Sequence, residues 1–102
     1  MNFGQVNMFF TKNAKRETAN KLGEYLTRTE FGDSPVSVQL DKSDSAHHFK
    51  MVSYAEVWND ETWDPTFQEY AKELSDSVFN TEKVIFHITD NEFGTQKLFV
   101  SN

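Results

Sequence analysis

The stretch Tyr54–Pro65 (YAEVWNDETWDP), together with the residues that follow it as far as Phe79, decides the fold that this sequence predicts. Asp64 suits the N-cap position of a helix, because its carboxylate can accept a hydrogen bond from a free N–H group of the first turn. Pro65 suits the first helical position, where the N–H group that proline lacks would have no partner anyway. The stretch therefore predicts a junction between a strand and a helix.

The residues after Pro65 predict an amphipathic helix with an acidic outer face. Apolar side chains recur at helical spacing and form one stripe, which comprises Phe67, Tyr70, Ala71, Leu74 and Val78. Polar side chains fall on the other side and comprise Gln68, Glu69, Lys72, Glu73, Ser75 and Asp76. The acidic face is either merely solvated, as charged helix faces usually are, or it binds a partner.

The composition is that of one small domain, residues 1–102. The chain has no cysteine, so disulfides and thiolate metal sites are excluded. No stretch approaches the ~20 apolar residues of a membrane span, and the N-terminus lacks the basic start and apolar run of a signal peptide. We therefore expect a cytoplasmic protein that makes no contact with a membrane.

The net charge of −6 is unevenly distributed along the chain. Residues 56–82 contain eight acidic side chains and one basic side chain, whereas residues 11–30 contain five basic and three acidic ones. An acidic surface repels the phosphates of nucleic acids and attracts basic partners. The sequence therefore predicts a basic protein partner and no direct binding of nucleic acid, which normally requires a basic footprint.

Hydrophobic periodicity predicts five strands and one further helix in the rest of the chain. That helix ends near Arg28 and carries Ala19, Leu22 and Leu26 on its core stripe. The expected strands are residues 3–10, 36–41, 47–58, 83–89 and 95–100. We expect Gly23, which lies beside the core stripe, to permit close packing against this helix.

The order of the elements, β-α-β-β-α-β-β, predicts the α+β class. The simplest arrangement is one mostly antiparallel sheet with both helices on one face. With right-handed crossovers, this arrangement is the ferredoxin-like split β-α-β fold with an additional C-terminal strand. The opposite face of the sheet would then be solvated or covered by a second copy of the chain.

No assembled catalytic, metal-binding or cofactor-binding motif occurs in the sequence, so we expect no catalytic residue, no metal and no cofactor. His47 and His48 are adjacent, and on a strand they point to opposite faces, which keeps them from readily sharing one metal ion. His87 lies in another strand. There is no G-x-S-x-G pattern, no cysteine nucleophile and no glycine-rich phosphate loop.

The two tryptophans, Trp58 and Trp63, have two alternative roles. Either both pack in the core and at the edge of the helix, or one is an exposed anchor for a partner, because tryptophan is enriched at interface hot spots. Acidic residues around such an anchor would steer a basic partner and set its orientation. In the second interpretation the partner-binding residues are Trp58, Glu61, Trp63, Glu69, Glu73 and Asp76.

The segment Val52–Leu74 carries the pattern YAEVWND at Tyr54–Asp60, followed by Phe67 and Tyr70. This segment resembles the third strand and second helix of antibiotic-biosynthesis-monooxygenase-like domains. The second helix lacks the histidine that is often present there, and the final hairpin is additional. The resemblance implies a ferredoxin-like fold and dimers that form through open sheet faces, and it transfers no catalytic residue.

Two functional hypotheses follow from these observations. The first is a small intracellular protein, of the phage-type inhibitor or regulator kind, that binds a basic, nucleic-acid-handling protein through the acidic helix face. The second is a cofactor-free monooxygenase-like enzyme or a small-ligand-binding protein. This second class needs an apolar pocket between the sheet and the helices, with Trp58, Tyr54 or Asn7 near it.

A homodimer formed through the uncovered sheet face is a further expectation. If Met51 and Val57 face the helices, then Val52, Tyr54 and Trp58 point outward and form one apolar row. Such a row is a large apolar area to leave in water, and a symmetric contact would bury it against its own copy. The inward and outward assignment could be reversed, because both faces of this strand are apolar.

Overall fold

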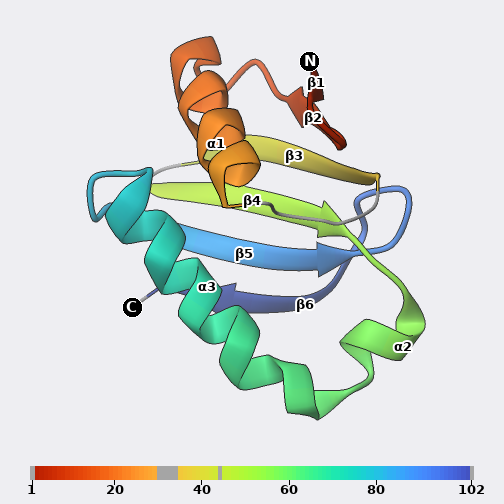
Figure 1. Ribbon diagram of the computed structural model, residues 1–102. Coiled ribbons are helices and arrows are strands. Elements are labelled where there is room, and N and C mark those ends of the chain that lie inside the picture. Colours follow the sequence, from red (N-terminus) through yellow and green to blue (C-terminus); the bar gives the residue numbers. More distant parts are fainter. Residues whose placement is uncertain (1, 30–34, 44, 102) are drawn as a thin grey trace.

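The structure is a computed structural model that describes residues 2–29, 35–43 and 45–101. Its strands are β1 (Asn2–Phe3), β2 (Val6–Phe10), β3 (Val36–Ser43), β4 (Ala46–Val52), β5 (Lys83–Thr89) and β6 (Thr95–Val100). Its helices are α1 (Arg16–Arg28), α2 (Ala55–Trp58), the 3-10 helix η1 (Glu61–Trp63) and α3 (Asp64–Ser77). Figure 1 shows one sheet with the two long helices, α1 and α3, on the same face. This arrangement confirms the α+β class.

The sheet is mixed, and its strands lie in the order of the sequence, β1-β2-β3-β4-β5-β6. The pairs β2–β3 and β4–β5 are parallel, and the other three neighbouring pairs are antiparallel. Each parallel pair is joined by one long helix, so the chain contains two β-α-β units linked by the β3–β4 hairpin. The expected ferredoxin-like topology is not confirmed, because in a split β-α-β unit another strand lies between the two parallel strands. The order of elements along the chain is compatible with both arrangements.

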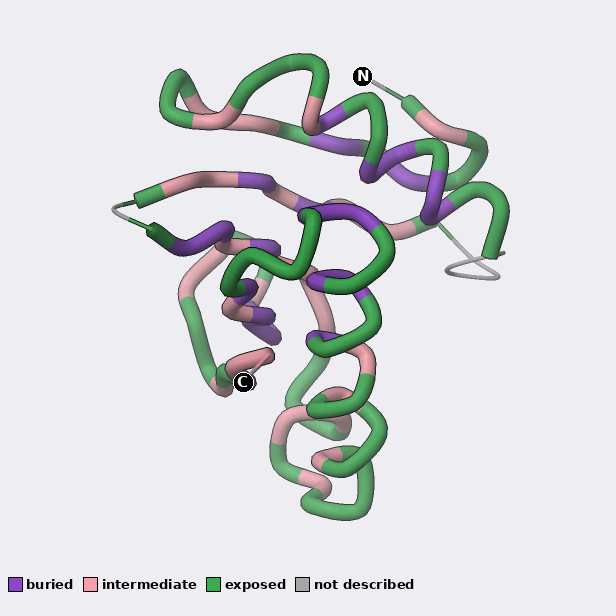
Figure 2. The backbone as a smooth tube through the Cα atoms, turned by 90° about the vertical axis from the view of Figure 1, so that its left-hand side faces the viewer, coloured by how far each residue is buried: buried purple, intermediate pink, exposed green. Residues whose placement is uncertain are grey.

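A row of apolar side chains crosses the centre of the core, which lies between the sheet and the two long helices. The strand register places side by side on β3 to β6 the residues Leu40, Phe49, Phe86 and Phe99. Phe49 stacks on Phe86 with ring centroids 5.5 Å apart, and all four residues are buried. Figure 2 shows that buried positions alternate with exposed ones along α1 and the second half of α3, as expected of amphipathic helices that cover an apolar sheet.

Residues 3–10, expected as a single strand, form a tight hairpin instead. Gly4 adopts a φ of 61°, a left-handed conformation that glycine reaches without strain, and it lies in the turn between β1 and β2. Phe3 then pairs with Val6 in an antiparallel register. The sheet therefore has one strand more than the periodicity predicted.

The junction between β4 and α3 also differs from the expectation. β4 ends at Val52, and Trp58 belongs to the short helix α2. Asp60 caps η1, since its carboxylate accepts a hydrogen bond from the backbone N–H of Thr62 at 3.0 Å. Asp64, expected as the N-cap residue, is the first residue of α3. Its negative charge still lies at the favourable end of the helix dipole.

Gly23 on α1 allows β1 to pack against this helix. A Cβ atom at position 23 would lie 2.4 Å from ring atoms of Phe3, far inside van der Waals contact. Phe3 is half-buried against the core. The missing side chain of Gly23 is therefore what admits the edge strand to the core, and the expected close packing is confirmed.

Gly23→Ala should lower the free energy of unfolding by about 1 kcal/mol. The substitution gains about 1 kcal/mol in helix propensity, but the cost of displacing the Phe3 ring is larger than this gain. The same substitution in a Phe3→Ala background should raise the free energy of unfolding, since only the gain in helix propensity remains. Urea unfolding of the four proteins measures both effects. Equal effects of Gly23→Ala in the two backgrounds would contradict the packing of Phe3 on this helix.

Candidate functional site

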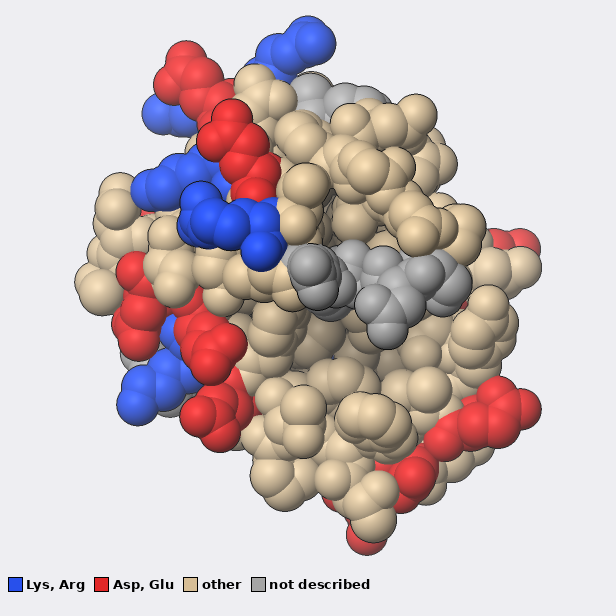
Figure 3. All heavy atoms as spheres, in the orientation of Figure 1, with Lys and Arg blue, Asp and Glu red and all other residues tan. Residues whose placement is uncertain are grey.

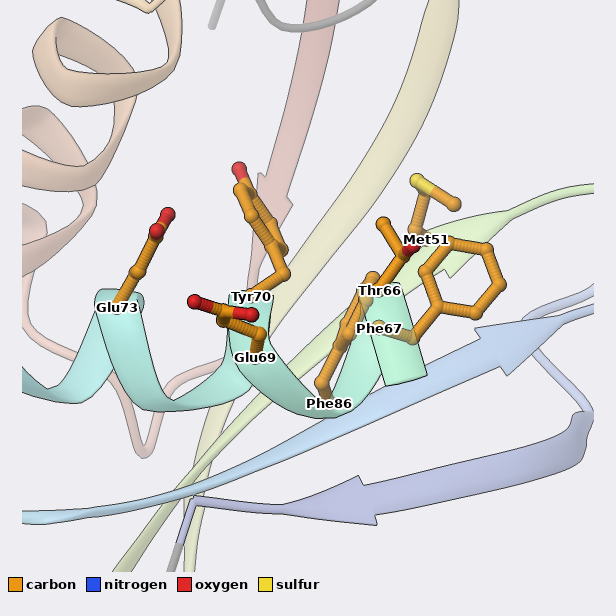
Figure 4. Close-up of a pocket in the computed structure, with 7 residues that line it drawn as sticks. All are labelled: Met51, Thr66, Phe67, Glu69, Tyr70, Glu73 and Phe86. Atoms are coloured by element: carbon orange, nitrogen blue, oxygen red, sulfur yellow. The ribbon is translucent and has the colours of Figure 1, made fainter. Parts of the chain in front are cut away.

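A pocket of about 350 Å³ opens between α3 and the helix-covered face of the sheet. Its lining residues are Met51 from β4, Phe86 from β5, and Thr66, Phe67, Glu69, Tyr70 and Glu73 from α3. Figure 4 shows these side chains along the first half of α3 and the strands beneath it. A pocket of this volume can hold a small ligand or one side chain of a partner.

The floor of the pocket is aromatic. The ring of Phe86 lies 5.7 Å from the ring of Phe67 in an edge-to-face contact, and 5.5 Å from the ring of Tyr70. Phe67 and Tyr70 reach this floor together because they lie three residues apart, on the apolar stripe of α3. The phenol of Tyr70 is protonated at neutral pH, as in any tyrosine, and burial raises its pKa further. The floor therefore offers apolar rings and carries no charge.

Two carboxylates lie at the rim of the pocket. Glu69 and Glu73 are exposed and lie one helical turn apart, at positions i and i+4 of α3. Among the described residues neither forms an ion pair, whereas Asp64 at the start of α3 pairs with Lys97. Like charges at this spacing repel each other. The rim therefore holds two negative charges close together, and Lys72, three residues after Glu69, is the one basic side chain of α3.

The negative charge continues along α3. Asp76 is exposed and follows Glu73 at i+3, so Glu69, Glu73 and Asp76 share one face of the helix, which we call the acidic stripe. Figure 3 shows acidic side chains along α3 with a basic side chain beside them, and side chains of both signs over α1. The sequence placed Glu69 and Glu73 on the outer face of the helix, and the structure shows that both also line the pocket.

The other predicted partner-binding residues lie around the start of α3. Trp63 is 45% exposed and stacks on Phe67 with ring centroids 5.8 Å apart, so it adjoins the pocket through that residue. Glu61 is exposed in η1. Trp58 is half-buried against the core and lies outside the described lining of the pocket. The structure thus places Trp63 beside one lining residue of the pocket, Phe67, and leaves Trp58 outside the described lining.

The three residues expected to form an apolar row do not share a strand. Val52 is the last residue of β4, and Tyr54 immediately precedes α2. Tyr54 is 72% exposed, whereas Trp58 packs against the core from α2. Side chains alternate between two faces only within a strand, and this strand ends before Tyr54. The premise of a single outward row is therefore corrected.

A second polar cluster crosses the uncovered face of the sheet. His48 Nδ1 lies 2.9 Å from His87 Nε2, which joins β4 to β5. Ser43 Oγ lies 2.7 Å from His48 Nε2, and Thr95 Oγ1 lies 3.0 Å from His87 Nδ1. The ring centroids of the two histidines are 5.1 Å apart, so the facing nitrogens lie nearly on the line between the rings. This head-on geometry is that of a hydrogen bond between the rings, not of two nitrogens directed at a common metal ion.

Burial favours the neutral form of both histidines. The pKa of His87 is lowered to about 4, first by burial and then by the neighbouring His48 and Lys50. Burial also lowers the pKa of His48, against the opposing effect of Asp41. Within the described part of the chain, no group of three or more His, Cys, Asp or Glu side chains could hold a metal ion.

Sequence reasoning missed two features of these sites. Met51 and Phe86 were not recognised as pocket residues, and the contact between His48 and His87 was not foreseen. Both features depend on the parallel pairing of β4 with β5, which sets His48 opposite Ile85 and brings His87 to the diagonal position. Strand alternation could have placed the two histidines on one face, but it carries no information on which strands are neighbours.

Comparison with known proteins defines a family for this chain. A family model with the description "family N-terminal domain", AF_1994_N, matches residues 1–100. The chain therefore belongs to the AF_1994_N family. No curated protein and no solved structure matches it. Among the described residues, no helix has the length and apolar character needed to cross a membrane.

Acid should destabilise this protein partly through His87. Folding holds the pKa of His87 near 4 against the ordinary value of 6.5, so the unfolded state binds the additional proton. Above pH 6.5 the titration of His87 does not lower the free energy of unfolding. As the pH falls from 6.5 to 4, this titration lowers the free energy of unfolding by on the order of 2 kcal/mol. Urea unfolding at neutral and mildly acidic pH measures this loss.

His87→Gln is the matched variant, because glutamine keeps hydrogen-bonding capacity and does not titrate. The variant should lose less stability than the wild type over this pH range. An equal loss in the two proteins would contradict a buried, neutral His87.

Proposed function

We propose that this protein binds a basic partner protein through the acidic stripe of α3 and thereby inhibits or regulates it. The observation that supports this function is the state of Glu69, Glu73 and Asp76. All three are exposed on one helix face, and none forms an ion pair among the described residues. Three like charges on one face oppose helix formation, and a local feature that opposes folding is expected at functional sites.

Two features of this surface would favour the binding of a basic partner. Opposite charges speed the encounter of two proteins and set their orientation. Trp63, which is 45% exposed beside the pocket, adds a large apolar side chain of the type enriched at interface hot spots. The sign of the field is that of a nucleic-acid backbone, so a cytoplasmic nucleic-acid-handling protein is the partner class that we favour.

Glu69→Lys/Glu73→Lys should weaken binding of the partner at least about tenfold, which corresponds to about 1.4 kcal/mol. The immobilised protein captures the partner from a lysate of the source organism, and the captured protein is then purified for titration calorimetry. Wild-type affinity should fall as salt concentration rises, because salt screens charges at the surface.

Glu24→Lys/Glu92→Lys is the matched control. It changes the net charge by the same amount at exposed positions on α1 and between β5 and β6. This control should bind like the wild type. Equal affinities of the wild type and Glu69→Lys/Glu73→Lys would refute the electrostatic mechanism.

A second candidate function is the binding of a small ligand, including a cofactor-free monooxygenase-like reaction on that ligand. The pocket of about 350 Å³ with its aromatic floor favours this candidate. Trp58, Tyr54 and Asn7, which this alternative expected near the ligand, lie outside the described lining. Native mass spectrometry of the purified protein would support this candidate by detecting a bound small molecule.

We also propose that the chain forms a homodimer through the uncovered face of the sheet. This face carries Phe9 and Leu98, which are 48% and 52% exposed. The strand register aligns both residues with His87 in one row across the sheet. A two-fold contact would place these side chains against their own copies and remove them from water. Val52, the one member of the expected row that lies on a strand, would be included.

Leu98→Glu should convert a dimer into a monomer and leave the fold intact, because position 98 is exposed and only an interface would reject the charge. Light scattering at concentrations on the order of tens of micromolar decides the question. Lys72→Glu, on the exposed side of α3, serves as the control and should remain dimeric. A wild-type mass near one chain would end this proposal.

A further inference from the structure

We propose that the pocket beside α3 receives the side chain of an arginine residue of the basic partner. This inference rests on the proposed function and names what the partner contributes to the site. An arginine side chain is an apolar stem that ends in a planar cation. The pocket has the complementary order, with apolar rings on its floor and two carboxylates at its rim.

The floor matches the stem and the flat face of the guanidinium group. Phe67, Tyr70 and Phe86 form one contiguous set of rings, in which Phe86 lies within 5.7 Å of both others. Met51 adds a flexible apolar side chain to the lining. Guanidinium groups stack on aromatic rings and are attracted by their negative faces. The floor therefore stabilises a cation that an aliphatic pocket would exclude.

The rim matches the charge. Glu69 and Glu73 line the same pocket as the rings, and within the described chain no cation occupies either carboxylate. A guanidinium group presents five N–H donors in a planar fork, so it can bond to carboxylates on neighbouring helical turns. A lysine ammonium group is a compact, strongly hydrated charge without a flat apolar face. Arginine is therefore the better fit.

The pocket at the start of α1 lacks this combination. It has a volume of about 240 Å³, and its carboxylate, Glu82, already bonds to His47 at 2.8 Å. Lys15 and Lys42 line the same space. The negative charge of this pocket is thus compensated within the chain, whereas no cation of the described chain forms an ion pair with the carboxylates of the α3 rim.

Titration with N-acetyl-arginine methylamide tests the pocket without the partner. We expect NMR shifts in residues 66–73 and in the methyl group of Met51, with a Kd on the order of millimolar for one isolated side chain. N-acetyl-citrulline methylamide keeps the shape of the probe without its charge, and it should bind at least about fivefold more weakly. Equal binding of the two probes, or shifts confined to other parts of the chain, would overturn the assignment.

Neutral variants identify the carboxylates. Glu69→Gln/Glu73→Gln should weaken binding of the arginine probe at least about fivefold, because it removes both charge-assisted hydrogen bonds. Glu24→Gln/Glu92→Gln removes two charges elsewhere and should bind the probe like the wild type. Equal weakening in both variants would show a general effect of net charge and would overturn a specific site.

Thr66→Trp separates failure of this inference from failure of the proposed function. The substitution fills the pocket from α3 and leaves both carboxylates in place, so it should reduce partner binding at least about fivefold. If the folded variant binds the partner like the wild type while Glu69→Lys/Glu73→Lys does not, the acidic stripe binds the partner and the arginine assignment is wrong. If neither variant changes partner binding, both proposals are wrong. A small molecule that copurifies in the pocket and is displaced by Thr66→Trp would also overturn the arginine assignment.

Discussion

The ring contacts of Phe86 are the interactions on which the rest of the structure depends. This ring lies 5.5 Å from Phe49, 5.7 Å from Phe67, 5.5 Å from Tyr70 and 6.4 Å from Phe99. It thereby connects β5 to both neighbouring strands and to α3, and the same ring forms part of the pocket floor. Protein cores are packed as densely as organic crystals, so a smaller side chain at this position would leave a cavity. Phe86 therefore contributes both to the packing of the core and to the shape of the site.

Two pockets beside the long helices have chemically different linings. Met51, near the end of β4, lines the pocket beside α3, and Lys42, near the end of β3, lines the pocket beside α1. Open α/β sheets generally bind ligands near the carboxyl ends of their parallel strands. Because β3 and β4 are antiparallel, their carboxyl ends lie at opposite ends of the sheet along the strand direction. The described lining beside α1 contains both signs of charge, whereas the charged groups in the described lining beside α3 are carboxylates alone, so the two pockets suit different occupants.

Periodicity in the sequence predicts the elements well and their arrangement poorly. The alternation of Val38 and Leu40 and the helical spacing of Phe67 and Tyr70 report which face of each element is buried, and the structure agrees. The order of the strands depends on which strand each one pairs with after the connecting helix, and no local sequence pattern specifies this pairing. The end of β4 was misjudged because Tyr54, Val57 and Trp58 belong to residue types enriched in strands but form α2 and its approach. The carboxylates of the site were visible as an acidic helix face, whereas its floor depends on contacts between separate elements.

Three of the four acidic side chains of α3 lie where their charges oppose the helix that carries them. The negative charge of Asp64, in the first turn, interacts favourably with the helix dipole, and its carboxylate pairs with Lys97. Asp76 lies in the last turn, where the dipole favours a cation, and that turn contains no basic residue. Glu69 and Glu73 add like-charge repulsion, and each of these effects is worth about 0.2–1 kcal/mol. A cation bound to the rim would reduce this repulsion. Binding and the stability of α3 are therefore coupled, and the charge arrangement that weakens the isolated helix is the one that a basic partner would make favourable.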